Sequence, residues 1–178
     1  MSEIKRYNAI MVVLHWLLAV FILGAIFMGA VVLDEMDSDH PQKIFLLKTH
    51  IIVGIGILLF TLLRLFVRFS MRQPAPLAGT GGWQDKLGKS VHYLLYLLTI
   101  LTVVSGLTLA VSADLPTVLL FHAGDLPRDY EDFQAHEVHD LFANLLLITI
   151  SIHAAAALYH HFILKDGILS RMSLRKER

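Results

Sequence analysis

The chain has 178 residues, of which 56% are apolar, and equal numbers of acidic and basic residues leave it without net charge. Its mean hydropathy of +0.63 is well above that of an ordinary soluble domain. Basic residues flank apolar stretches instead of forming a stripe, which excludes a soluble nucleic-acid-binding protein. The absence of cysteine excludes covalently attached c-type haem, cysteine-ligated iron–sulfur clusters and disulfide bonds.

Four apolar stretches dominate the chain, at about residues 11–33, 44–67, 91–111 and 139–164. Each is long enough to cross roughly 30 Å of hydrocarbon as a helix. Four spans with mostly short connections predict an all-α integral membrane protein, a four-helix up-down bundle forming a single domain over residues 1–178. We expect the first stretch to act as an uncleaved signal anchor, because acidic residues follow it and no small-residue cleavage site does.

The basic residues predict the orientation of the bundle. On one side of the predicted spans lie Lys5, Arg6, Arg64, Arg68, Arg72, Lys86, Lys89, Lys165, Arg171, Arg175, Lys176 and Arg178. On the other side lie Lys43, Lys48 and Arg128. Cytoplasmic flanks carry the excess of lysine and arginine, so both termini and the loop at 68–90 are predicted to be cytoplasmic in a bacterial inner membrane.

The connections differ in character. The short acidic loop at 34–43 predicts that the first two helices are antiparallel neighbours. In the cytoplasmic linker at 70–90, Pro74, Pro76 and a glycine-rich run predict no regular structure. The external loop at 112–137 is longer and acidic, and whether it holds a short amphipathic helix over the bundle mouth stays open.

The histidines sort by depth into two pairs. His15 lies near the cytoplasmic end of the first helix, and His50 lies near the external end of the second. On the fourth helix, His139 and His153 are fourteen residues apart, which places them about 40° apart around the helix and roughly 21 Å apart along it. Depth therefore pairs His15 with His153 on the inner side and His50 with His139 on the outer side.

Two imidazoles without a thiolate or carboxylate suit a low-spin haem iron, for which the porphyrin supplies the other four ligands. Structural zinc prefers four protein ligands, which neither pair provides. Small residues that would leave room for a flat macrocycle lie nearby, namely Gly24, Gly29, Gly54, Gly56, Gly106 and the run at 154–157. The alternative is that the histidines are hydrogen-bonded packing residues and that the small residues only permit close helix packing.

Other polar residues have less definite predicted roles. His92 opens the third helix at the depth of the inner pair and is not expected to be an axial ligand. His136 competes with His139 as the outer ligand, although the fourteen-residue phase favours His139. Arg64 and Arg68 share one helix face and suit haem propionates or, preferably, anionic headgroups. Candidates that could support the outer pair are Lys48, Thr49 and Asp140.

Several stretches carry a resemblance to the bacterial cytochrome b561 family, and within it to short four-helix members similar to superoxide:ubiquinone oxidoreductase. These stretches are LHWLLA (14–19), LKTHIIVGI (47–55), LRLFVR (63–68), LGKSVHYLLY (87–96) and HDLFANLLLITISIHAAAALYHHFILKDGILSRM (139–172). The resemblance covers nearly the whole chain apart from the two external loops.

This resemblance implies two haem b groups with His15, His50, His139 and His153 as axial ligands of the iron. It also implies a quinone site near the cytoplasmic haem. His160 is the candidate there, because it follows His153 by seven residues on about the same helix face. It could hydrogen-bond a quinone carbonyl and exchange a proton. The alternative is that His160 and His161 face water at the headgroup level.

The leading hypothesis is a di-haem electron conduit that links an external donor, superoxide being one possibility, to ubiquinone at the cytoplasmic side of a respiratory membrane. A second hypothesis is a cytochrome b subunit that serves a separate dehydrogenase or soluble electron carrier. A third, from another class, is a non-catalytic haem or metal carrier. All three leave membrane lipid as the surrounding partner and assign no role with nucleic acid.

Overall fold

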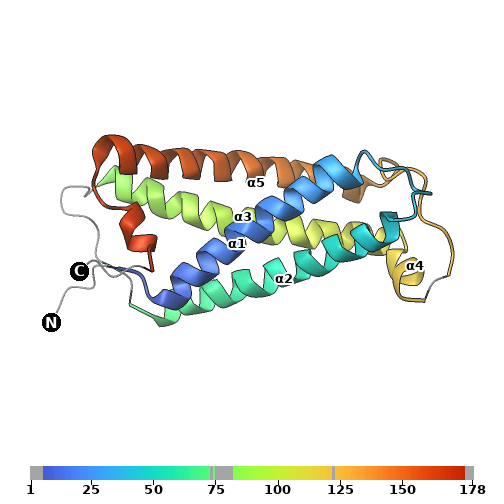
Figure 1. Cartoon of the computed structure of the whole chain (residues 1–178), viewed down its shortest axis with the longest axis horizontal. Coiled ribbons are helices and arrows are strands. Elements are labelled where there is room, and N and C mark those ends of the chain that lie inside the picture. Colours follow the sequence, from blue (N-terminus) through green and yellow to red (C-terminus); the bar gives the residue numbers. More distant parts are fainter. Residues whose placement is uncertain (1–5, 73, 75–81, 122, 175–178) are drawn as a thin grey trace.

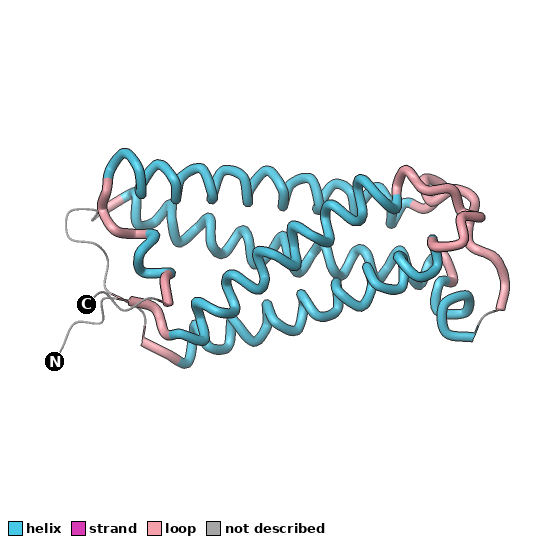
Figure 2. The backbone as a smooth tube through the Cα atoms, in the orientation of Figure 1, coloured by secondary structure: helices cyan, strands magenta, loops and turns pink. Residues whose placement is uncertain are grey.

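The computed structural model of the chain describes residues 6–72, 74, 82–121 and 123–174. Its four long helical rods lie roughly parallel to one axis, with short connections at both ends (Figures 1 and 2). These rods are α1 (Ala9–Phe27) with a π-helical extension (Met28–Leu33), α2 (Lys43–Ser70), α3 (Trp83–Ser112), and α5 (Gln134–Tyr159) with a π-helical extension (His160–Leu164). All four are long and apolar enough to cross a membrane. The described residues contain no strand, so the predicted all-α membrane bundle is confirmed.

Two short elements complete the described chain. The helix α4 (Leu115–Phe121) lies in the loop at 112–137, where the sequence left a short helix open, and it buries Leu115 and Leu119 against the end of α3. A 3-10 turn (Leu169–Met172) folds back beside the start of α1. There the indole N–H of Trp16 donates to the Met172 carbonyl (3.0 Å), and the Tyr7 amide donates to the Arg171 carbonyl (3.3 Å).

The prediction that residues 70–90 lack regular structure is wrong for their second half, because α3 begins at Trp83. Gly82 precedes the helix with φ of 124°, a conformation that glycine adopts without the penalty that a Cβ would bring. Residues 83–90 contain no proline, so nothing in them prevents the helix from extending eight residues before the apolar stretch. Similarly, α5 begins at Gln134, five residues before its predicted start.

The helices pack as two close pairs. α3 and α5 contact each other along much of their length, α1 packs on α2, and α1 meets α5 at few positions. Buried apolar clusters are stacked along the bundle, with Met11 and Val67 near one end, Leu18 and Ile57 in the middle, and Leu115 at the other end. α2 also packs on α3, and the middle cluster includes Val103 of α3, so side chains of both pairs meet at the seam between them.

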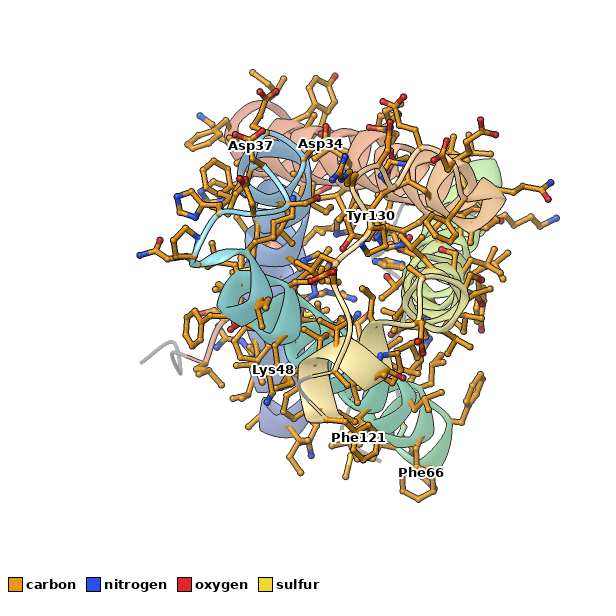
Figure 3. The ribbon with its side chains drawn as sticks, turned by 90° about the vertical axis from the view of Figure 1, so that its right-hand side faces the viewer. Asp34, Asp37, Lys48, Phe66, Phe121 and Tyr130 are labelled. Atoms are coloured by element: carbon orange, nitrogen blue, oxygen red, sulfur yellow. The ribbon has the colours of Figure 1, made fainter. Side chains whose placement is uncertain are left out.

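Large apolar side chains cover the outside of the bundle. Phe66 is 68% exposed and Phe121 is 75% exposed, and Figure 3 shows both pointing outward. A surface of this kind suits lipid rather than water, because the hydrocarbon core carries no cost for exposed apolar groups while the helices satisfy their own backbone polar groups.

Candidate functional site

The inner histidine pair joins α1 to α5. The ring centroids of His15 and His153 lie 6.3 Å apart, with an angle of 80° between the ring planes. The outer pair joins α2 to α5, and the centroids of His50 and His139 also lie 6.3 Å apart, at 87°. Both pairs thus span the seam between the two helix pairs, and each brings together the residues that depth in the membrane had matched.

The centroid separation can be compared with the spacing that a shared metal ion requires. An imidazole nitrogen lies about 2.0 Å from a bound metal, and about 1.2 Å from its own ring centre, so two trans imidazoles have centroids about 6.4 Å apart. Both pairs match this spacing. His92 approaches His153 to a centroid distance of 5.3 Å, which is too short for these two rings to be trans ligands of one ion.

The orientation of His139 comes from α3. Its Nδ1 lies 2.9 Å from the Thr102 carbonyl oxygen, which accepts the Nδ1–H, and 3.3 Å from the Ser105 hydroxyl oxygen. With Nδ1 protonated, Nε2 keeps a free lone pair, as a metal-binding imidazole requires. Thr102 and Ser105 were missed from the sequence. Their signal was a polar pair three residues apart beside Gly106, in the middle of an apolar helix.

Two glycines make room for the outer imidazoles. A Cβ at Gly106 would lie 2.8 Å from Cε1 of His139, and a Cβ at Gly29 would lie 3.4 Å from Cε1 of His50. At Gly24, Gly54 and Gly56 an added Cβ would meet no atom within 4 Å. The first two glycines therefore accommodate the histidines, whereas the other three border open space.

Two of the residues that the sequence suggested as support for the outer pair, Thr49 and Asp140, contact other groups. The Thr49 hydroxyl donates to the Phe45 carbonyl of its own helix (2.8 Å), and Asp140 lies 3.7 Å from Nδ1 of His136. His136 therefore has a carboxylate neighbour of its own. His50 Nδ1 is buried without a hydrogen-bond partner, so this ring, unlike that of His139, is not oriented by a hydrogen bond at Nδ1.

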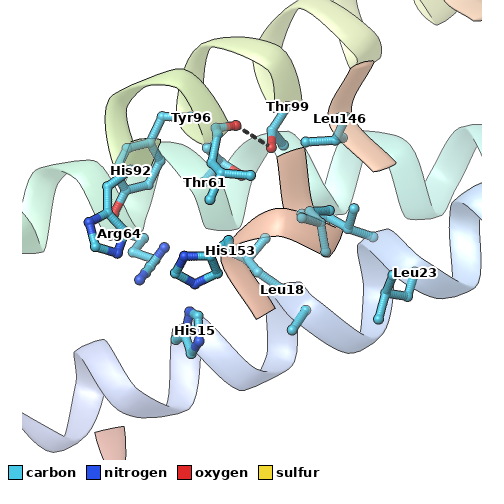
Figure 4. A pocket seen from close by; sticks show the side chains of 14 residues that line it. His15, Leu18, Leu23, Thr61, Arg64, His92, Tyr96, Thr99, Leu146 and His153 are labelled. Carbon is cyan, nitrogen blue, oxygen red and sulfur yellow. Dashed lines mark hydrogen bonds between the residues drawn. The ribbon is translucent and has the colours of Figure 1, made fainter. Parts of the chain in front are cut away.

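A cavity surrounds the inner pair and reaches toward the middle of the bundle. It contains about 640 Å³ of space free of protein atoms, part of it open to the outside. Figure 4 shows His15, His153, His92 and Arg64 around one end, and Leu18, Leu23 and Leu146 toward the other. Apolar walls with a few convergent polar groups are typical of a cofactor pocket.

The polar groups of this cavity are short of acceptors. Thr61 Oγ1, Arg64 Nε and the Tyr96 hydroxyl are all buried without a hydrogen-bond partner. The Arg64 guanidinium lies over the Tyr96 ring at 5.3 Å. The hydrogen bond drawn in Figure 4 belongs to Thr99, whose hydroxyl donates to the Leu95 carbonyl (2.7 Å).

At the C-terminal end of α5, His160 pairs with Asp166. His160 Nδ1 lies 2.5 Å from Oδ2 of Asp166, and Oδ1 of Asp166 accepts from the Ile168 amide (3.1 Å). Burial by itself raises the pKa of Asp166, but the hydrogen bonds from His160 and Ile168 outweigh it and hold the pKa below its usual value. His161 is exposed. His160 is not among the residues that line the inner cavity.

One of the three basic residues at the other end of the bundle is buried. Lys43 is 4% exposed, and its ammonium donates to the Leu33 and Met36 carbonyls (2.5 and 2.6 Å) at the end of the first span. It also lies 5.8 Å from the Tyr130 ring centroid. Burial raises the pKa of Tyr130 to about 12, so this phenol stays neutral. Figure 3 shows Lys48 and the carboxylates Asp34 and Asp37 around this end.

Of the basic residues that predict the orientation, Lys5, Arg175, Lys176 and Arg178 lie outside the described residues. His40 is exposed, and its Nδ1 accepts from the Gln42 amide (3.2 Å). Within residues 6–72, 74, 82–121 and 123–174, no group of three or more His, Cys, Asp or Glu is arranged to hold a metal ion. The histidines of interest occur as pairs, which fits a metal whose remaining ligands come from a macrocycle.

Comparison with known proteins identifies the family. The profile of the prokaryotic cytochrome b561 family matches residues 6–173. The chain belongs to this family. It is 27% identical to cytochrome b561 homolog 1 of Escherichia coli (97% of this chain, 99% of the relative) and 28% identical to cytochrome b562 of Cereibacter sphaeroides (97% and 98%). It is also 27% identical to the probable superoxide oxidase CybB of Yersinia pestis (97% and 98%).

Family membership establishes the general class of the protein. It is a multi-pass inner-membrane protein of electron transfer, and the family implies that it binds haem b. The paired histidines, the free lone pair at His139 and the apolar inner cavity fit such a group. The resemblance noted from the sequence is thus confirmed.

Proposed function

We propose that this cytochrome b561 carries electrons through the membrane between an external donor and ubiquinone on the cytoplasmic side. In this proposal the whole chain is one domain holding two haem b groups, one between His15 and His153 and one between His50 and His139. The observation that carries it is the equal 6.3 Å separation of both ring pairs, close to the spacing of two axial imidazoles.

The proposed orientation places both termini in the cytoplasm. The distribution of lysine and arginine supports it, since the cytoplasmic flanks of membrane proteins carry the excess. Arg68 and Arg171 would then lie on the cytoplasmic side, and Lys48 and Arg128 on the external side. The inner histidine pair lies at the first of these ends, and the outer pair at the second.

The protein's own contribution to electron transfer is ligation and exclusion of water. Haem, when bound, supplies a one-electron redox couple. The Thr102 carbonyl holds the His139 ring in one tautomer, Gly106 lets that ring approach α3, and apolar helices surround both pairs. A low dielectric and fixed ring positions reduce the reorganisation that accompanies each change of charge.

The proposed quinone site lies at His160. Asp166 accepts from Nδ1 of His160, which leaves Nε2 as the atom that exchanges a proton with a quinone oxygen. Reduction of a quinone to a quinol consumes two electrons and two protons. A histidine at the membrane surface, 30% exposed and held by a carboxylate, can pass those protons in from water.

Superoxide is the small-molecule donor we favour, supported by the similarity to the probable superoxide oxidase of Yersinia pestis. Two superoxide ions would each lose one electron and leave as dioxygen, and one quinone would take both electrons together with two protons. The external cations available to attract superoxide are Lys48 and Arg128, because Lys43 is buried at the helix end.

A protein donor is the second candidate, and the acidic external face favours it. Asp34, Asp37, Asp129, Glu131 and Asp132 lie in the two external loops, and Lys43 is withdrawn from the surface. A dehydrogenase or soluble cytochrome with a basic face would be complementary to this end. Slow reaction with superoxide, together with fast reduction by a basic cytochrome at low salt, would support this candidate.

The first test is the haem content of the purified protein in detergent. A dithionite-reduced minus oxidised spectrum with pyridine haemochromogen quantification should give two haem b per chain with low-spin bands. One haem would show that one histidine pair is misassigned, and His136 would be the first residue to re-examine. No haem in protein made with ample haem supply would refute the proposal and favour the metal-carrier hypothesis.

A further inference from the structure

The inner cavity contains a cation, Arg64, that no carboxylate of the described residues neutralises. Arg64 follows His50 on α2 at position i+14, which is also the spacing from His139 to His153 on α5. Arg64 therefore reaches the level of the inner histidine pair, where it lines the cavity together with His15 and His153. Among the described residues, no Asp or Glu forms an ion pair with it.

Two further donors converge on the same space. The Thr61 hydroxyl, one turn before Arg64 on α2, and the Tyr96 hydroxyl on α3 are buried and unpartnered, as is Nε of Arg64. The residue Thr61 is 1% exposed and Tyr96 is 6% exposed. A buried donor without an acceptor costs on the order of 1–3 kcal/mol, and an uncompensated cation costs more. Three such groups in one cavity indicate a site built for an acceptor that the polypeptide does not supply.

We infer that Arg64, Thr61 and Tyr96 form a carboxylate-binding site for a propionate of the inner haem. A carboxylate matches the guanidinium fork and accepts from hydroxyl groups at the same time. The Tyr96 ring beneath the guanidinium limits its movement and so preorganises the fork. This inference deepens the proposed function and rests on it, because it assigns residues to one of the two proposed haem groups.

Arg68 provides the matched comparison. It lies one turn beyond Arg64 on the same helix and stacks on Tyr93 at 5.5 Å, in the way that Arg64 stacks on Tyr96. Arg68 is not among the residues that line the cavity. The two arginines therefore lie on the same helix, carry the same charge and each stack on a tyrosine, and they differ in access to the inner site.

The experiment compares haem b with its dimethyl ester, which has the same iron and ring but no free carboxylate. The full chain, produced without haem supply and carrying His50→Ala so that the inner site alone is measured, is titrated with each compound in neutral detergent. We expect the ester to bind about 10- to 100-fold more weakly, as loss of charge-assisted hydrogen bonds predicts. Arg64→Gln should abolish this difference, and Arg68→Gln should preserve it.

Two additional variants keep the test decisive if Arg64→Gln does not fold. Arg64→Lys keeps the charge but loses the planar fork, and it should reduce the ester discrimination without abolishing it. Tyr96→Phe removes a hydroxyl that has no partner in the protein, so a structural role predicts no loss of haem affinity. The carboxylate site instead predicts a few-fold loss with haem b and none with the ester.

The outcomes separate this inference from the proposed function. Equal binding of haem b and its ester by the unsubstituted protein would overturn the carboxylate site while leaving the haem site intact. Discrimination that survives Arg64→Gln would also overturn it. A phospholipid that copurifies with the protein by ³¹P NMR, and is lost in Arg64→Gln without any ester discrimination, would assign the site to a lipid headgroup instead. Failure to bind either compound would refute the proposed haem site itself.

Discussion

Replacing Gly106 by alanine should displace haem from the outer site while leaving the inner site filled. The added Cβ would lie 2.8 Å from Cε1 and 3.0 Å from Nδ1 of His139. Ordinary contact begins at 3.4 Å, so the ring has to retreat by 3.4 − 2.8 = 0.6 Å. The Thr102 carbonyl and the Ser105 hydroxyl hold Nδ1 where it is, and the ring cannot retreat without lengthening these hydrogen bonds.

The size of the effect follows from two costs. Overpacking a close-packed site costs about 1–3 kcal/mol, and loss of the hydrogen bond from His139 adds about 1 kcal/mol. Together they correspond to a roughly 30- to 1000-fold loss of affinity at the outer site. Helix propensity acts in the opposite direction, because alanine in a helix is favoured over glycine by about 1 kcal/mol. A loss of haem therefore reports the clash rather than a weakened helix.

The assay is haem stoichiometry combined with a potentiometric titration of the purified protein. We expect close to one haem per chain and a single redox component in Gly106→Ala. Gly54→Ala is the matched control, since its Cβ would meet no atom within 4 Å, and it should retain two haems. Two haems with unchanged midpoint potentials in Gly106→Ala would refute the placement of His139 as the outer ligand against α3.

Three further outcomes are expected. Replacing His92 by leucine should leave haem stoichiometry at two, because its ring lies too close to His153 for the two to be trans ligands of one iron, and loss of the inner haem would contradict this. Lys43→Met should destabilise the protein by about 1–3 kcal/mol in thermal unfolding, because two backbone carbonyls lose their donor. Lys48→Met should leave stability unchanged and slow the reaction with superoxide a few-fold at low salt. The depressed pKa of Asp166 means that its contribution to stability is present above the ordinary carboxyl pKa and is lost as the pH falls through the folded-state value. The indole N–H resonance of Trp16, which reports the docked C-terminal turn, should therefore stay unchanged from pH 8 to pH 5 and shift only in more acidic solution.

Local periodicity and composition were enough to predict the bundle and its histidine pairs. Apolar length alone specifies four spans, since a helix must satisfy its backbone internally to cross a bilayer. The spacing of fourteen positions between His139 and His153 places both on one face of the fourth helix. Because successive spans alternate in direction, His15 lies at the depth of His153 and His50 at the depth of His139. Each of these relations depends on one helix and the membrane thickness, so no tertiary contact was needed.

Contacts between helices decided the rest. The orientation of His139 by the Thr102 carbonyl depends on which turn of α3 meets which turn of α5. The burial of Lys43 depends on how the end of the first span and the loop after it fold over this side chain. The same holds for the convergence of Thr61, Arg64 and Tyr96 on one cavity. Sequence spacing describes the face of a single helix, whereas rotation and register between helices arise from packing small and large side chains across the seam, and only the tertiary structure contains that information.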